Sequence, residues 1–422
     1  MHIIMMAFVV FTVSQPQLPF EDDNEWVAEG WEIIRMETYD IADYVEPYSV
    51  IDRTEDYFVD FSISEKGSLA VLIGGKMQTR LIYENKELDI SELTSTSPLL
   101  VLNLAYYFLN SIETDPEMNN FWELVGSISS IRDAGVQSTI ATNCDGTLVG
   151  ISGFCAIVFD ESENASILFD YFDHTMQRIS NWGIARNGNL LVLARYRENC
   201  LSAYDMSGNH LWNYSLDLSG GTMPMKISDN GEVVGATATR NGYVLLNRDG
   251  QLISHVLDDP SKWQVESSAL SPNGRFAALT ASPLSTDTMA ETQLFLVDIR
   301  TCAVSQINLN GFATSLTPNV VDISQNGYIL CGLFERENSN DRSESLYGTI
   351  VLDPSGELVW ASDRSETTSS LIDTSTPVLP MMSIYDAAYG YNGTIRSSNN
   401  SISLAYLDIN NGYISAIYLE AR

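Results

Sequence analysis

The stretch MKISDNGEVVGATATRNGYVLLNRDGQLISHVL, Met225–Leu257, decides the fold of this 422-residue chain. Three pairs of the form Asn-Gly or Asp-Gly divide it into short runs rich in Val, Leu, Ile and Thr. Glycine after Asn or Asp supplies the positive φ of a tight hairpin turn, and short apolar runs between such turns are typical of strands. The stretch therefore predicts four antiparallel strands joined by three short turns.

The first of these turns belongs to a motif that recurs along the chain: apolar, small, any residue, Asn or Asp, Gly, any residue, apolar, any residue, small. Clear copies are Ile184–Val192, Ile227–Gly235, Leu270–Ala278 and Ile323–Cys331, and weaker copies are Ile63–Val71, Thr142–Gly150 and Tyr389–Ser397. The glycines at positions 146, 188, 231 and 274 are 42 or 43 residues apart. This spacing matches the repeat of about 40–45 residues that forms a four-stranded propeller blade.

We therefore predict an all-β fold, a seven-bladed β-propeller with four-stranded antiparallel blades. Eight blades are the alternative, because the 79-residue interval between Gly67 and Gly146 could hold a degenerate blade that includes LLVLNLAYYFLNS. In the domain division, residues 1–14 are a signal peptide, 15–57 an acidic N-terminal segment and 58–422 the propeller. The stretch WEIIRME in the acidic segment alternates in polarity and could be an edge strand that closes the ring.

The strands of a blade are named A to D from the axis outward, so the recurring motif is the A–B turn. A second turn, the C–D turn, begins at Asp160, Asp205, Asn247, Asp298, Asp353 and Asp408. Extra length lies elsewhere, near Ser91–Gln137, Ala281–Glu291, Glu335–Leu346 and Asp363–Pro380. All four insertions occupy B–C or D–A positions, which strand order places on one face of the disc. Because loops on rigid scaffolds often carry binding function, we expect them to surround one mouth of the channel, with neutral drift as the competing explanation.

Two groups of segments resemble known propeller repeats. LSPNGRFAALTAS with LFLVDIRTCAVSQI resembles the WD-like repeat of the periplasmic Tol-system propeller, and VLDPSGELVWAS and AYDMSGNHLWNYS resemble repeats of PQQ-type propellers. The resemblance covers Phe58–Glu420. The chain lacks the Gly-His and Trp-Asp dipeptides of true WD repeats and the vicinal Cys-Cys pair of quinoprotein dehydrogenases. The resemblance therefore implies an exported bacterial propeller, and it does not indicate a substrate.

Charge and the N-terminus bear on location and partners. The formal net charge of −33, from 55 acidic and 22 basic residues, argues against nucleic acid, whose phosphates need clustered Lys and Arg. The apolar run Ile3–Val13 is too short to span a bilayer and has the length of a secretory signal. We expect a secreted or periplasmic protein with no membrane insertion after signal cleavage, although a buried N-terminal strand would give the same run.

No motif for a metal, a cofactor or a catalytic residue stands out. The odd number of cysteines favours free thiols used as small buried residues over a zinc site; they are Cys144, Cys155, Cys200, Cys302 and Cys331. Of the four histidines, His2 falls in the predicted signal peptide, and His174, His210 and His255 lie in different repeats. We predict no cofactor, and Ca²⁺ bound by loop carboxylates is the one ion that the acidic composition allows.

The leading functional hypothesis is an exported scaffold that binds a protein or a glycan through its loop-rich face. The candidate binding residues are Phe121, Trp122, Arg336, Asp341, Arg342 and Tyr347. For the aromatic ones, packing beneath their own loops is the competing interpretation. The alternative function is a propeller hydrolase or lyase with carboxylates in the channel. A deep channel holding carboxylates with Arg or His would favour the enzyme, and a plugged channel would favour the scaffold.

Overall fold

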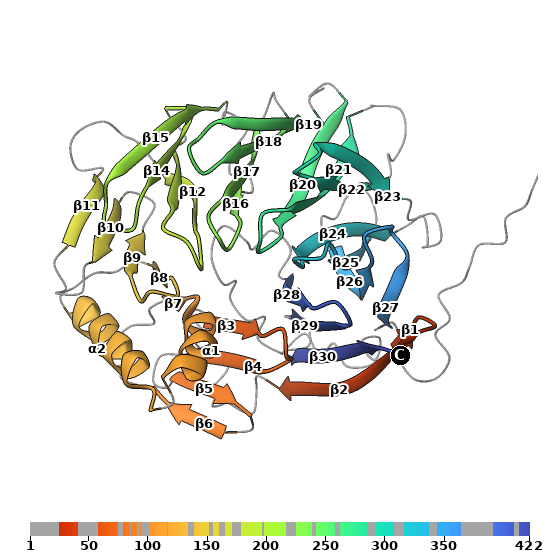
Figure 1. Cartoon of the computed structure of the whole chain (residues 1–422), viewed down its shortest axis with the longest axis horizontal. Coiled ribbons are helices and arrows are strands. Elements are labelled where there is room, and N and C mark those ends of the chain that lie inside the picture. Colours follow the sequence, from red (N-terminus) through yellow and green to blue (C-terminus); the bar gives the residue numbers. More distant parts are fainter. Residues whose placement is uncertain are drawn as a thin grey trace, which may run out of the picture.

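The computed structural model of the chain is a ring of seven sheets around a central axis (Figure 1). The residues that the structure describes are 25–40, 58–74, 79–84, 86–90, 93, 101–115, 117–133, 139–151, 155–159, 165–170, 179–195, 198–216, 225–238, 242–257, 262–284, 292–307, 316–336, 344–363, 391–408 and 413–422. Each sheet holds the four antiparallel strands of one blade, and two sheets hold a fifth strand. The predicted seven-bladed β-propeller is confirmed, and eight blades are excluded.

The first four blades are built in chain order, from the innermost to the outermost strand. Blade 1 is β3 (Phe58–Ile63), β4 (Leu69–Gly74), β5 (Thr79–Tyr83) and β6 (Lys86–Asp89); blade 2 is β8 (Thr139–Thr142), β9 (Leu148–Ile151), β10 (Cys155–Phe159) and β11 (Ala165–Asp170). Blade 3 is β12 (Ile179–Ile184), β13 (Leu191–Arg195), β14 (Cys200–Tyr204) and β15 (His210–Ser215); blade 4 is β16 (Met225–Ile227), β17 (Val233–Ala238), β18 (Gly242–Asn247) and β19 (Leu252–Val256).

The remaining blades involve both ends of the described chain. Blade 5 is β20 (Trp263–Leu270), β21 (Phe276–Pro283), β22 (Gln293–Asp298) and β23 (Ala303–Ile307); blade 6 is β24 (Leu316–Ile323), β25 (Ile329–Arg336), β26 (Glu344–Leu352) and β27 (Leu358–Asp363). Blade 7 is β28 (Tyr391–Ser397), β29 (Ser401–Asp408), β30 (Tyr413–Ala421) and, as its outer strand, β2 (Trp31–Asp40). The strand β1 (Glu25–Val27) adds a fifth strand outside β27.

The N-terminal segment closes the ring. Strand β2 pairs antiparallel with β30 along its whole length, from Trp31 opposite Ala421 to Asp40 opposite Tyr413. This is the place in the ring where the alternation of WEIIRME predicts an edge strand. Residues 1–24 and 41–57 lie outside the described residues, so the domain boundaries and the signal peptide stay predictions.

The same closure corrects the assignment of the last repeat. Gly393 lies inside β28 and not in an A–B turn, and the turn that begins at Asp408 joins strands B and C of blade 7. The cause is that β2 supplies strand D, so the C-terminal part of the chain provides only three strands of this blade. The true A–B turn of blade 7 therefore lies between Ser397 and Ser401.

Glycine serves the two kinds of turn in different ways. In the A–B turns, Gly231 and Gly274 have φ of +71° and +67°, which confirms the positive φ predicted for both. In the C–D turns, a Cβ on Gly250 would lie 2.6 Å from the Trp212 ring. The C–D glycine thus also lets the outer strand of the preceding blade approach closely.

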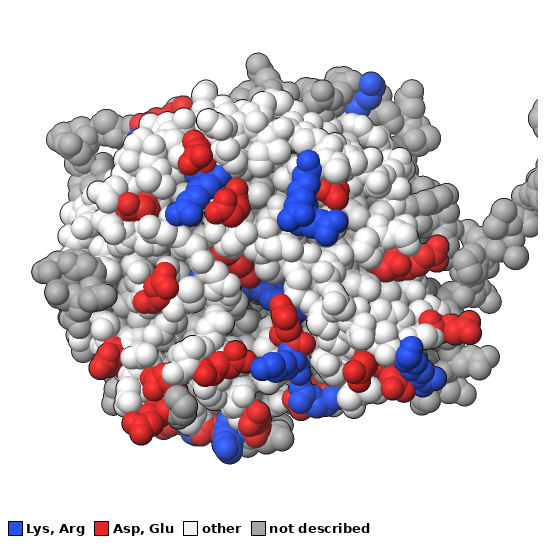
Figure 2. Space-filling model, in the orientation of Figure 1, with Lys and Arg blue, Asp and Glu red and all other residues white. Residues whose placement is uncertain are grey.

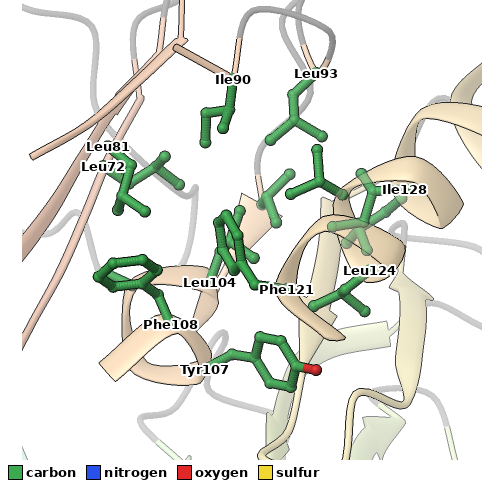
Figure 3. Packing of buried hydrophobic residues seen from close by; sticks show 14 of the residues in the cluster. Leu72, Leu81, Ile90, Leu93, Leu104, Tyr107, Phe108, Phe121, Leu124 and Ile128 are labelled. Carbon is green, nitrogen blue, oxygen red and sulfur yellow. The ribbon is translucent and has the colours of Figure 1, made fainter. Parts of the chain in front are cut away.

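Apolar layers fill the spaces between neighbouring blades, and the layer between blades 1 and 2 differs from the others. It contains the helices α1 (Leu104–Thr114) and α2 (Asn119–Asp133), which follow β7 (Val101–Leu102), a short strand parallel to β8. Figure 3 shows side chains of both helices and of blade 1 pointing toward one another, among them Leu72, Leu81, Leu104, Phe108, Phe121, Leu124 and Ile128. We expected the insertion near 91–137 to project from one face. Its described residues instead lie within the ring, between blades 1 and 2.

Candidate functional site

The A–B turns form a hydrogen-bonded collar at one end of the axis. Three links share one form, in which a backbone N–H of one turn donates to a carbonyl of the next: Cys144 to Arg186 (2.7 Å), Asn187 to Asp229 (2.7 Å) and Asn230 to Pro272 (3.2 Å). Three more links use the amide side chain of the motif asparagine: Asn230 to Asn273 (3.2 Å), Asn273 to Gln325 (3.0 Å) and Asn326 to Ser398 (2.9 Å). The recurring asparagine therefore joins blades, which its turn-forming role alone does not predict.

The unrestricted third position of the motif borders the axis. Its residues in the first six blades are Glu65, Cys144, Arg186, Asp229, Pro272 and Gln325. Gln325 of blade 6 donates its side-chain amide to Glu65 of blade 1 at 2.7 Å, across the position of blade 7. Side chains of non-adjacent blades can meet in this way only near the axis. A position that the repeat leaves unrestricted is thus the one that gives the axial mouth its chemistry.

Two arginines and three aspartates form what we call the axial cluster: Asp60, Arg186, Asp229, Asp322 and Arg396. The Arg396 guanidinium pairs with Asp229 of blade 4 at 3.3 Å and with Asp322 of blade 6 at 3.2 Å. Only 8% of the Arg396 side chain is exposed. Figure 2 shows basic and acidic atoms meeting at the centre of the disc. Because blades 4 and 7 are not neighbours, the ion pair between Arg396 and Asp229 bridges the axis.

The start of α1 docks on this cluster. Arg186 donates from Nε to the Asn103 side-chain oxygen at 3.2 Å, and its guanidinium lies 5.2 Å from the centre of the Tyr106 ring. Asp60 of β3 accepts the backbone N–H of Ala105 at 2.9 Å. A carboxylate at the first turn of a helix satisfies N–H groups that have no partner within the helix. The insertion between blades 1 and 2 is therefore fastened to the axis.

The protonation of the cluster follows from burial and charge. Burial raises the pKa of Asp60 to about 6, although the amide of Ala105 and the charge of Arg186 act in the opposite direction. Burial alone would lower the pKa of Arg186, but Asp229 and Asp322 outweigh it and the pKa is raised. Burial also raises the pKa of the Cys144 thiol to about 11, so this axial cysteine is not a thiolate at neutral pH.

The chemistry available to this arrangement is limited. Both arginines face aspartates, and the Asp60 carboxylate is bound to the helix. Within the described part of the chain, no group of three or more His, Cys, Asp or Glu side chains is arranged to hold a metal ion. The axial cluster therefore places charges that already have partners at the A–B end of the axis.

The structure describes the side chains of two of the six predicted binding residues. Phe121 has no exposed surface and packs edge-on against Phe108 with ring centroids 5.2 Å apart, so it is a core residue and not a surface anchor. Trp122, its neighbour on α2, is 42% exposed. Arg336 and Tyr347 are in β25 and β26, but their side chains are outside the described part. Asp341 and Arg342 also lie outside the described residues.

On the face opposite the collar, the second strand of the blade extends farther in blades 5 and 6 than in blade 4. Strand β21 ends nine residues after Gly274, and β25 ends nine residues after Gly327. In blade 4, β17 ends only seven residues after Gly231. At about 3.3 Å per residue, two further residues raise the B–C ends of blades 5 and 6 by about 7 Å. The long connections predicted near 281–291 and 335–346 begin at this raised edge, and the one near 363–380 follows β27 of blade 6; most of their residues lie outside the described part.

Comparison with known proteins does not name a family. No protein-family model matches the chain, and no curated protein matches its sequence significantly. The likeness to Tol-system and PQQ-type repeats therefore stays a resemblance of short segments, and the seven-bladed fold is what the structure establishes.

Sequence reasoning missed the axial cluster, although one signal was present. The third position of the motif holds Glu, Cys, Arg, Asp, Pro and Gln in turn, while its neighbours repeat. Variation at one position within a regular repeat indicates a position that the fold does not restrict. Arg396 had no such signal, because the last motif copy was assigned to the wrong turn.

Proposed function

We propose that this chain is an exported binding scaffold without catalytic activity, whose loop-rich face docks a protein or a glycan. One observation carries the proposal: the ion pair between Arg396 and Asp229 joins non-adjacent blades across the axis, and the Arg396 side chain is only 8% exposed. When side chains bridge the axis of a propeller, its two faces and its outer rim remain available to bind a partner. The short A–B turns are joined in the collar, so the connections with freedom to vary are those of the opposite face.

Blades 5 to 7 are the part of that face on which binding is best supported. The B–C ends of β21 and β25 rise above those of blade 4, and the connections 284–292, 337–343 and 364–390 leave from blades 5 and 6. We expect these connections on consecutive blades to contribute to one binding surface, because recognition of a macromolecule takes about 20–30 residues on each side. The proposed site includes the earlier candidates Arg336, Asp341, Arg342 and Tyr347.

A hydrolase or lyase with a channel carboxylate is the second candidate, and Asp60 is the observation in its favour. A carboxyl with a pKa of about 6 suits general acid–base catalysis near neutral pH. Against this role, Asp60 already accepts the Ala105 N–H at 2.9 Å and supports the start of α1. A turnover by the purified chain that Asp60→Asn abolishes would establish the enzyme and overturn the scaffold.

Export is part of the proposal and rests on the sequence of residues 1–14, which lie outside the described residues. Among the helices described, none is long and apolar enough to cross a membrane. Expression in a secreting host followed by N-terminal sequencing tests the export. A mature chain beginning at Gln15 would support it, and an intact chain retained in the cytoplasm would contradict it.

Binding is tested by shortening one connection. Candidate partners come from a glycan array and from cross-linking of the full chain to secreted proteins. Replacing residues 337–343 by Asn-Gly should leave the fold nearly intact, because loop-length costs are only about 0.6 kcal/mol per doubling. We expect the affinity for the identified partner to fall at least about tenfold, or about 1.4 kcal/mol. The control is Glu232→Gln in an A–B turn, which should bind normally; a folded loop variant with native affinity contradicts the proposal.

A further inference from the structure

Helix α2 buries one side and presents an aromatic side chain to solvent on the other. Phe121, Leu124 and Ile128 are 6% exposed or less, whereas Trp122 is 42% exposed. Gly126 follows Trp122 by one helical turn, and a Cβ built on it meets no atom within 4 Å. The surface beside the indole is therefore open, because no side chain covers the Trp122 ring from position 126.

The surroundings of Trp122 carry more acidic than basic residues. Residues 104–133, which span both helices, contain five acidic residues and one basic residue, Arg132. Asp115 is engaged in the fold, because it accepts the backbone N–H of Asn120 at 2.7 Å. Glu117 and Glu123 are exposed, and Glu123 makes no ion pair with any residue that the structure describes. An exposed tryptophan on an acidic helical segment is a surface complementary to a cation.

We propose that Trp122, with Glu117 and Glu123, docks an arginine- or lysine-bearing segment of a protein partner. The cationic head would lie over the indole face, and the carboxylates would pair with it or with a neighbouring basic residue. Tryptophan is the strongest aromatic partner of cations and is enriched among residues that dominate interfaces. A net charge of −33 adds long-range attraction for such a segment.

This inference goes beyond the proposed function, because it concerns a different surface. Helices α1 and α2 pack in the layer between blades 1 and 2, whereas the loop-rich face proposed above rises on blades 5 and 6. The loop-shortened variant leaves Trp122 unchanged, and changes at Trp122 leave the connection 337–343 unchanged. Failure of one proposal is therefore distinguishable from failure of the other.

The experiment uses the full chain and three fluorescein-labelled peptides of ten residues, in which Gly alternates with Arg, with Lys or with Glu. Binding is followed by fluorescence anisotropy at 50 and 150 mM salt. We expect the Arg and Lys peptides to bind and the Glu peptide not to bind. An exposed cation–π contact is worth about 0.5–1 kcal/mol, so Trp122→Ala should weaken the Arg peptide by roughly two- to fivefold at both salt concentrations, and Glu123→Gln by a similar or smaller factor.

Matched variants separate this site from general attraction to an acidic protein. Leu211 on β15 is 44% exposed, so Leu211→Ala removes comparable exposed apolar surface elsewhere and should leave binding unchanged. Trp122→Phe keeps an aromatic ring and should recover part of the affinity. In protein labelled with 5-fluorotryptophan, the ¹⁹F signal missing from Trp122→Phe should shift on addition of the Arg peptide.

Two results overturn the proposal. One is binding of the Arg peptide that Trp122→Ala leaves unchanged, with no shift of the Trp122 signal, since the peptide would then bind the acidic surface at large. The other is no binding of either basic peptide at 50 mM salt. Thermal unfolding of each variant confirms that the compared proteins are folded.

Discussion

Neighbouring blades are joined in two different ways. Blades 2 to 7 are joined by hydrogen bonds between turns, and blades 1 and 2 are joined by the helical insertion. Along the collar, each A–B turn bonds to the next through the motif asparagine or its neighbours. Between blades 1 and 2 the helical insertion makes the connection, with Glu113 of α1 3.4 Å from Lys66 of one turn and Tyr107 packed beside Gly146 of the other. A repeated polar link and an apolar wedge can therefore serve the same position in a ring.

The largest expected effect breaks the wedge. Phe121→Ala removes a fully buried ring from the layer between blades 1 and 2 and should lower the free energy of unfolding by about 3–5 kcal/mol. The matched change Trp122→Ala, on the exposed side of the same helix, should cost less than about 1 kcal/mol. Urea unfolding of both variants provides the comparison. Equal losses would mean that α2 does not pack as a core element.

The next largest effect is expected from breaking the ion pairs of the axial cluster. Arg396→Met leaves Asp229 and Asp322 partly buried without their shared cation, so we expect a loss of about 3 kcal/mol. The double change Arg396→Met, Asp322→Asn should recover much of this loss, because Asp229 keeps its ion pair with Arg186. Chemical denaturation measures both. A double variant no more stable than the single one would show that the cluster acts by packing and not by charge.

A pair of glycines sharpens the contrast between collar and helix. Gly231 has φ of +71° and a built Cβ 3.2 Å from Ala185, so Gly231→Ala should destabilise by about 1–2 kcal/mol. Gly126 lies in α2 with open space around it, so Gly126→Ala should stabilise by about 0.5–1 kcal/mol through helix propensity. Opposite shifts in melting temperature are the expected result, and two shifts of the same sign would contradict it.

A further expected effect is a pH dependence at the contact between β3 and α1. The folded-state pKa of Asp60 is raised from 3.8 to about 6, so between these values the folded state binds a proton that the unfolded state releases. Stability should therefore fall as pH rises from about 4 to about 6, and then level off. Asp60→Asn should remove this component of the slope. A slope that is identical in both proteins would exclude Asp60 as its source.

Some features could be predicted from the sequence because they depend on local geometry. The Asn-Gly and Asp-Gly turns and the 42- to 43-residue spacing determined the blades, since tight turns and short apolar runs restrict the backbone over a few residues. The alternation in WEIIRME indicated the edge strand that β2 provides. The same motif led us to assign Gly393 to an A–B turn. A local motif carries no information about which distant strand completes the blade, and here that strand is β2.

Tertiary structure alone decided the features that depend on contacts between distant segments. The apolar run around LAYYFL is compatible with a strand or a buried helix, and only the space between blades 1 and 2 made it α1. Trp122 and Phe121 are adjacent and similar in character, yet the helix places one outside and one inside. Asp60, Asp229 and Arg396 are separated by more than 150 residues from one another in sequence, and closure of the ring is what brings their charges together at the axis.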